Sequence, residues 1–280
     1  MNDLQLRFQT GGEIQAIHGD NVILSAGAIQ SPPILLRSGI GSADDVATLG
    51  VGLIHELPGV GRNLIEHPMA YVFSVPKPGA CDMANPLFQS MLHYTSNGGE
   101  ENDMRSYAVN HIVLTDLPEI HEIFGVDLAF AIAPGLQRPN LRGRLHVETA
   151  DLRAAPRIEL NFFDDEKDRA RMREGVRIAW GIAQAPEIAE FYDRIELLDQ
   201  ATIDDDESLD EYIWNTAAHI FHPVGTAKMG PASDPDAVVD SHGRVHGIGG
   251  PRVVDASIMP NIPRANTNLT CTMIGERVAD

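Results

Sequence analysis

His222 lies in a local sequence that is suited to proton transfer. It opens the run His-Pro-Val-Gly-Thr, in which Pro223 restricts the histidine backbone to extended conformations and Gly225 permits a tight loop. An imidazole near its ordinary pKa accepts a proton at neutral pH, as the oxidation of an alcohol requires. The residues alone leave two interpretations open, a catalytic base and a histidine with a purely structural role.

The start of a C-terminal helix is a second candidate. Asn and Thr residues precede the apolar run from Leu269, so we expect a helix to begin between Asn268 and Thr270. The free N–H groups and the dipole of that N-terminus would favour a nearby anion. Taken alone, the residues favour a well-capped terminal helix that binds nothing.

Two further patterns, a histidine spacing and a glycine-rich turn, do not predict a binding site. His219 and His222 are three residues apart and His242 and His246 four apart, as in some zinc sites. However, Pro223 interrupts a helix and no cysteine or carboxylate completes a ligand set, so we expect no metal. Gly39-Ile40-Gly41 lacks the third glycine of a dinucleotide fingerprint and follows a predicted helix where a strand is required. The sequence therefore contains no complete nucleotide-binding module.

The helices and strands that must position these residues change in kind along the chain, from a parallel strand and a helix near the N-terminus to antiparallel strands and helices further on. Alternating apolar residues predict a hairpin over 4–17 that turns at Gly11-Gly12, and the run 22–28 predicts a buried parallel strand whose end opens onto a ligand. Ser31, followed by two prolines, predicts the N-cap of the next helix. Further on we expect antiparallel strands and a long helix capped at Asp164-Asp165, followed by a helix that starts in the acidic run 204–207.

Composition excludes several classes of partner. The formal charge of −19 argues against binding to nucleic acid or to anionic lipid. No apolar run of about 18 residues predicts a membrane span, and the sequence after Met1 does not resemble a signal peptide. Two distant cysteines, Cys81 and Cys271, imply no disulfide framework, which suits a reducing cytoplasm.

Several long motifs are spread over nearly the whole chain. They are Ser25-Ala26-Gly27-Ala28-Ile29-Gln30-Ser31-Pro32, Pro58-Gly59-Val60-Gly61-Arg62-Asn63-Leu64, His222-Pro223-Val224-Gly225-Thr226, Arg252-Val253-Val254-Asp255-Ala256-Ser257 and Asn266-Thr267-Asn268. These motifs resemble those of the glucose–methanol–choline (GMC) oxidoreductases, and the motifs from His222 onward resemble those of choline dehydrogenase-like members.

This resemblance implies an FAD-dependent enzyme that transfers a hydride from a small-molecule alcohol to the flavin. His222 matches the active-site base, and Asn268 matches the partner that holds the substrate oxygen. The residues that the resemblance places along FAD are Ala26, Gly27, Asp255, Ala256, Asn268 and Thr270. The helix N-terminus at Asn268 would stabilise negative charge on the reduced flavin.

The resemblance also implies an α/β (α+β) fold with three consecutive parts. Residues 1–74 would be the remainder of a Rossmann-like FAD-binding domain, and residues 75–215 a substrate domain with an antiparallel sheet flanked by helices. Residues 216–280 would return to the FAD-binding domain with the catalytic groups.

Family members carry a Gly-x-Gly-x-x-Gly turn in an N-terminal half that this sequence lacks, so we hypothesise a missing N-terminal half. Two alternatives stay open: an inactive fragment that requires a complementary chain, and a flavin lyase of the same fold. The alcohol, the electron acceptor and the oligomeric state also stay open.

Overall fold

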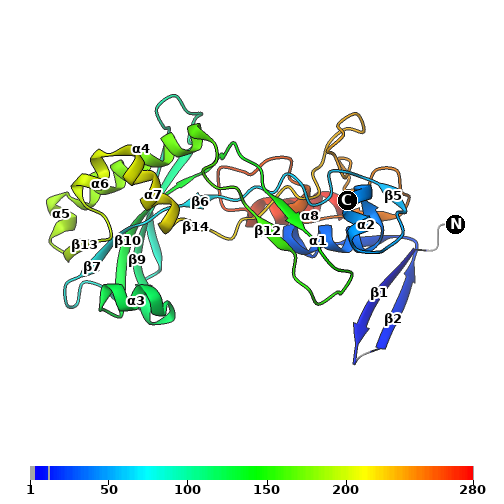
Figure 1. Ribbon diagram of the computed structural model, residues 1–280, viewed down its shortest axis with the longest axis horizontal. Coiled ribbons are helices and arrows are strands. Elements are labelled where there is room, and N and C mark those ends of the chain that lie inside the picture. The colour runs from blue at the N-terminus through cyan, green and yellow to red at the C-terminus, as the bar shows by residue number, and fades with distance from the viewer. Residues whose placement is uncertain (1–3, 12, 280) are drawn as a thin grey trace. The chain divides into compact units, whose positions relative to one another are not determined.

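The computed structural model describes residues 4–11 and 13–279. The chain divides into two compact units (Figure 1): unit 1 takes in residues 1–66, 142–161 and 221–280, and unit 2 takes in residues 67–141 and 162–220. The mixed α/β class expected from the sequence is confirmed, with short parallel pairings in unit 1 and a large antiparallel sheet in unit 2. No helix in the described part of the chain is both long enough and apolar enough to cross a membrane.

Unit 1 is built from short elements around one apolar core. Its strands are β1 (Leu4–Thr10), β2 (Glu13–Gly19), β3 (Val22–Leu24), β4 (Ile40–Gly41), β5 (His55–Glu56), β11 (Arg144–His146), β12 (Arg157–Glu159) and β15 (Pro251–Val253). Its helices are α1 (Gly27–Arg37), α2 (Ala43–Thr48), the 3-10 turn η2 (Ala256–Ile258) and α8 (Asn268–Ala279). The predicted hairpin is present as β1–β2 and projects from the rest of the unit (Figure 1), although Gly12 of its turn lies outside the described residues.

The predicted start of α1 is wrong. The helix begins at Gly27 and not at Ser31, and its prolines lie inside it. Pro32 has no N–H to donate to the carbonyl of Ala28, and the hydroxyl of Thr226 donates to that carbonyl instead, at 2.6 Å. A distant residue thus compensates for the proline, which a local capping argument could not foresee.

Residues 142–161 belong to unit 1, whereas the division drawn from the sequence placed them in its middle part. Hydrogen bonds explain the difference, because Gly143 and Leu64 exchange backbone bonds of 2.7 and 3.0 Å and the N–H of Leu145 donates to the carbonyl of Gly61 at 2.8 Å. The β11–β12 hairpin is therefore tied to the loop that precedes residue 66.

Unit 2 is an antiparallel sheet with helices packed on it. Among the described residues the sheet has seven strands: β6 (Pro68–Met69), β7 (Val72–Pro76), β8 (Phe88–Tyr94), β9 (Met104–Val113), β10 (Leu128–Leu136), β13 (Tyr192–Glu196) and β14 (Ala218–His219). The helices are η1 (Leu114–Asp116), α3 (Pro118–Phe124), α4 (Glu166–Ala183), α5 (Pro186–Ala189), α6 (Gln200–Asp204) and α7 (Asp206–Thr216). Helices α4, α6 and α7 lie together on one side of the unit, and α3 lies apart from them (Figure 1).

Helix α4 confirms its prediction from the sequence. The carboxylate of Asp165 caps it by accepting from the N–H groups of Lys167 and Asp168 at 3.0 and 3.1 Å. The apolar stripe Met172, Val176, Ala179 and Ala183 is buried in one core cluster together with residues of the sheet and of α7. The acidic run likewise starts α7, with Asp205 as its N-cap.

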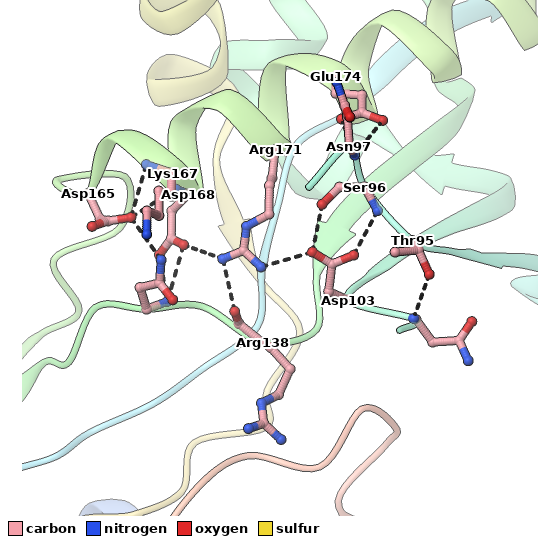
Figure 2. Close-up of polar contacts among 12 residues, drawn as sticks. Thr95, Ser96, Asn97, Asp103, Arg138, Asp165, Lys167, Asp168, Arg171 and Glu174 are labelled. Carbon is pink, nitrogen blue, oxygen red and sulfur yellow. Dashed lines mark hydrogen bonds and ion pairs between the residues drawn. The ribbon is translucent and has the colours of Figure 1, made fainter. Parts of the chain in front are cut away.

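Arg171 of α4 is the centre of a buried polar network in unit 2 (Figure 2). Its guanidinium forms ion pairs with Asp168 and, at 3.1 Å, with Asp103, and it donates to the carbonyl of Arg138 at 2.9 Å. The carboxylate of Asp168 also accepts from the N–H of Asn140. Because both buried carboxylates have cationic and N–H partners, their burial is compensated. The network fixes residues 138–140 against α4, just before the chain enters unit 1.

Candidate functional site

The ends of two parallel strands bring distant predicted residues together in unit 1. β3 and β15 pair in parallel, with Leu24 opposite Val253, and the N–H of Val254 donates to the carbonyl of Leu24 at 2.8 Å. Ala26 and Gly27 therefore follow one strand where Asp255 and Ala256 follow the other. The carboxyl ends of parallel strands are where α/β folds bind their ligands.

Asp255 is the polar centre of this cluster. One carboxylate oxygen accepts from the N–H of Gly27 at 2.9 Å and from the hydroxyl of Ser31 at 2.5 Å, and the other accepts from the N–H of Ser257 at 2.8 Å. Gly27 has a φ of +81°, which a residue with a side chain rarely adopts. The carboxylate thus occupies the N-terminus of α1, and Ser31 is its partner and not a helix cap.

The segment that carries His222 lies against the residues that follow Asp255. Gly225, Ala227 and Met229 donate their N–H groups to the carbonyls of Ala256, Ser257 and Ile258, at 3.2, 2.8 and 2.8 Å. His222 itself is half-buried. The segment that starts three residues after His222 is therefore bound through its backbone to the residues that follow Asp255.

Helix α8 begins at Asn268, within the predicted range. The N–H of Cys271 donates to the carbonyl of Thr267 at 2.9 Å, which closes the first turn. Asn268 is exposed and Thr270 is half-buried. Ile274 and Cys271 of α8 belong to the same apolar cluster as Val254, Ala256 and Ile258, so the first turns of α8 pack on the core that holds the Asp255 segment. Burial raises the pKa of the Cys271 thiol, and the negative charge of Asp255 raises it further.

The first-turn N–H groups of α8 have no acceptor within the helix, as at any helix start. They give this end of α8 a partial positive charge, which would stabilise an anion or a developing negative charge. All the predicted site residues thus lie in unit 1, on segments that converge on Asp255 and Ala256.

Several polar residues of this region were missed by reasoning from the sequence. Asn63 donates from its amide to the carbonyl of Gly225 at 3.2 Å and accepts from Arg142 at 3.1 Å. Arg142 also contacts the side-chain oxygen of Asn261 at 3.4 Å, and the carboxylate of Glu66 accepts from the N–H of His222 at 2.7 Å. Asn63 stands in a recognised motif, but nothing in the sequence indicated which residue it would contact.

The other histidines considered as metal ligands, His219, His242 and His246, do not form a ligand set with His222. His246 contacts the carbonyl of Gly230 at 3.0 Å, His242 is exposed, and His219 belongs to β14 of unit 2. Among residues 4–11 and 13–279, no group of three or more His, Cys, Asp or Glu side chains is arranged to hold a metal ion.

Unit 2 contains a cavity of about 590 Å³ that holds none of the predicted site residues. Strands β8, β9 and β10 line it, together with Ile182, Ile188 and Phe191. Its volume suits a small molecule, and most of its lining is apolar.

Comparisons with known proteins identify one family of oxidoreductases that is similar to this chain. Two sequence profiles described as GMC oxidoreductase match the chain, one over residues 4–69 and the other over residues 139–275. An oxygen-dependent choline dehydrogenase of Escherichia coli O45:K1 (strain S88 / ExPEC) is 36% identical over 286 residues, covering 95% of this chain and 50% of the relative. A 5-(hydroxymethyl)furfural oxidase of Methylovorus sp. (strain MP688) is 33% identical, covering 96% of this chain and 52% of the relative.

Solved structures give the same result. Pyridoxine 4-oxidase from Mesorbium loti superposes with a TM-score of 0.87 at 26% identity, covering 98% of this chain and 53% of that one. A formate oxidase from Aspergillus oryzae RIB40 superposes with a TM-score of 0.83 at 22% identity, covering 97% and 56%, which supports the fold alone. The chain spans about half the length of the curated relatives that it matches.

Proposed function

The chain belongs to the glucose–methanol–choline (GMC) oxidoreductase family, and from this premise we propose that it carries the catalytic groups of an FAD-dependent alcohol oxidoreductase. Proteins of this family are FAD-binding flavoproteins. The observation that carries the proposal is the convergence of His222, the Asp255 cluster and the start of α8 within one unit.

The residues at the strand ends fit a bound FAD. Ala26, Gly27 and Ala256 are small, so backbone and cofactor can approach closely where β3 and β15 end. Asp255 orders this surface by binding both strand ends. Asn268 and Thr270 lie in the first turn of α8, whose dipole favours negative charge. When bound, FAD supplies the two-electron acceptor for the alcohol.

Within this proposal each catalytic side chain has one task. The imidazole of His222 takes the hydroxyl proton of the alcohol, and the amide of Asn268 donates a hydrogen bond to the alcohol oxygen. Together they hold the alcohol in one orientation and leave its carbon–hydrogen bond free to react. Reduction of the flavin separates alcohol oxidation from the flavin lyase alternative, because a lyase reaction is redox-neutral and leaves the flavin oxidised.

The substrate panel follows from the relatives. We call "holoenzyme" the FAD-loaded protein formed by this chain and any polypeptide that completes its cofactor site. Mixed without oxygen with choline, 5-hydroxymethylfurfural, pyridoxine and simple primary alcohols, the holoenzyme is expected to lose its flavin absorbance with at least one of them. 5-Methylfurfural, which lacks the hydroxyl group, is the matched control. If dithionite bleached the flavin but no alcohol did, alcohol oxidation would be the wrong activity.

A specific observation supports the second candidate function, a chain that is inactive without a complementary polypeptide. The 280 residues contain no complete Gly-x-Gly-x-x-Gly fingerprint. Ile23 of the parallel pair β3–β15 is 59% exposed, and Leu269 and Met273 of α8 are 82% and 54% exposed. Parallel sheets are normally covered on both faces, so these apolar surfaces suit contact with further polypeptide.

We therefore expect the 280-residue chain, purified alone, to hold little FAD. The measurement is the visible absorbance spectrum after gel filtration in the presence of excess FAD, with the holoenzyme as the reference. A yellow protein with one FAD per chain would contradict this expectation.

A further inference from the structure

We propose that Glu66 is a positioning residue for His222, and that its buried carboxylate sets the direction of the imidazole by binding the histidine backbone. The inference rests on the proposed function, because it assigns to Glu66 a role in the action of the candidate base. Nothing in the sequence pattern around Glu66 indicates such a role.

The contact itself is short and sheltered. Glu66 is 3% exposed, and its Oε2 accepts from the backbone N–H of His222 at 2.7 Å. A buried carboxylate is costly unless donors satisfy it, and a charged acceptor makes a shorter and stronger hydrogen bond than a neutral one. The two residues are 156 positions apart, so the bond joins segments that the chain does not hold together locally.

The backbone beside this bond is strained. Phe221 has a φ of +61°, a left-handed conformation that is unfavourable for a bulky residue, and its side chain is 81% exposed. Strained backbone of this kind persists only where its surroundings fix it. The next N–H along the chain, that of His222, donates its hydrogen bond to Glu66. The carboxylate is therefore placed to hold the backbone between Phe221 and His222.

The other end of the same loop is held independently. Ile65 and Val224 exchange backbone hydrogen bonds of 3.0 and 2.9 Å, and the amide of Asn63 donates to the carbonyl of Gly225 at 3.2 Å. Residues 63–66 thus bind residues 222–225 at both ends. Pro223 further limits the backbone of His222 to extended conformations. Loss of the contact with Glu66 would free the end of the loop that directs the imidazole.

Two conservative variants separate this role from a purely electrostatic one. Glu66→Gln keeps an acceptor oxygen at the same reach and removes the charge, whereas Glu66→Asp keeps the charge and withdraws the oxygen by one methylene. If position matters, the rate constant for flavin reduction in Glu66→Gln should lie within about threefold of that in the unchanged holoenzyme. In Glu66→Asp the rate constant should be about 10- to 100-fold lower, the range expected when a catalytic group is misplaced by about 1 Å. The apparent dissociation constant of the alcohol should change little in either variant.

Hydrogen–deuterium exchange provides a readout that does not depend on activity. A peptide containing residues 221–226 should exchange faster in Glu66→Asp, because the His222 amide loses its acceptor, and at the original rate in Glu66→Gln. Glu56→Gln, at an exposed position of strand β5, is the matched control and should leave both rates unchanged.

The opposite ranking, with Glu66→Gln slow and Glu66→Asp fast, would overturn the proposal, and so would wild-type rates in both. A His222→Ala variant in the same series distinguishes failure of the proposed function from failure of the role assigned to Glu66. A fast His222→Ala would refute the proposed function, whereas a slow His222→Ala beside a fast Glu66→Asp would refute the role of Glu66 alone.

Discussion

Replacing His222 with alanine is expected to slow flavin reduction by alcohol about 10²- to 10⁴-fold, the usual contribution of a general base. FAD should remain bound, because the residues proposed to hold it stay in place: the Asp255 carboxylate keeps its bonds to Gly27, Ser31 and Ser257. The loss should therefore appear in the rate constant for flavin reduction and not in the flavin content. Anaerobic stopped-flow absorbance measures the first, and the visible spectrum measures the second.

His242→Ala is the matched control for this experiment. His242 is an exposed histidine of the same unit, and its Nδ1 contacts the hydroxyl of its neighbour Ser241 at 3.3 Å. It should leave the rate unchanged. A His222→Ala holoenzyme that reduced its flavin at the normal rate would remove the imidazole from the chemistry.

Gly225→Ala is expected to disrupt the same loop by a steric route. Gly225 has a φ of +91°, and a Cβ there would lie 2.4 Å from the carbonyl oxygen of Asn63 and 2.7 Å from its amide nitrogen. The Asn63 side chain is itself bound to Arg142, so it cannot withdraw without breaking that contact. Strain and overpacking together should destabilise the protein by about 2–4 kcal/mol and slow flavin reduction as well.

Thermal unfolding of the holoenzyme measures this effect, and Gly181→Ala provides the control. Gly181 lies in helix α4 with nothing within 4 Å of the added Cβ, so alanine should be neutral or stabilising there by up to about 1 kcal/mol. Equal unfolding temperatures for Gly225→Ala and the unchanged protein would mean that the loop is more adaptable than these contacts imply.

Local signals in the sequence predicted those elements that local interactions determine. Helix α4 was predicted from the spacing of Met172, Val176 and Ala183 and from a cap at Asp164-Asp165, and the structure has both the buried stripe and a cap at Asp165. The start of α1 was wrong because Ser31 binds Asp255, which is 224 residues away and invisible to a capping rule. The placement of residues 142–161 depended on backbone bonds to residues 61–64, which are equally non-local.

For the candidate site, too, the sequence identified residues but not the long-range contacts between them. Motifs identified which residues to examine, and the structure gathers Ala26, Gly27, Asp255 and Ala256 at two strand ends. The motifs did not reveal Glu66, because its role depends on a hydrogen bond to a backbone N–H that any residue at position 222 except proline would offer. The assigned roles of these residues remain predictions.

The central claim is that the imidazole of His222 and the amide of Asn268 act on the same alcohol oxygen. A crystal structure of the holoenzyme with a bound, unreactive alcohol analogue would test it most directly. We expect an imidazole nitrogen of His222 and the amide nitrogen of Asn268 each to lie within about 3.2 Å of the analogue's oxygen, the reach of a hydrogen bond. An analogue whose oxygen contacted neither side chain, with the two residues facing different surfaces, would contradict the claim.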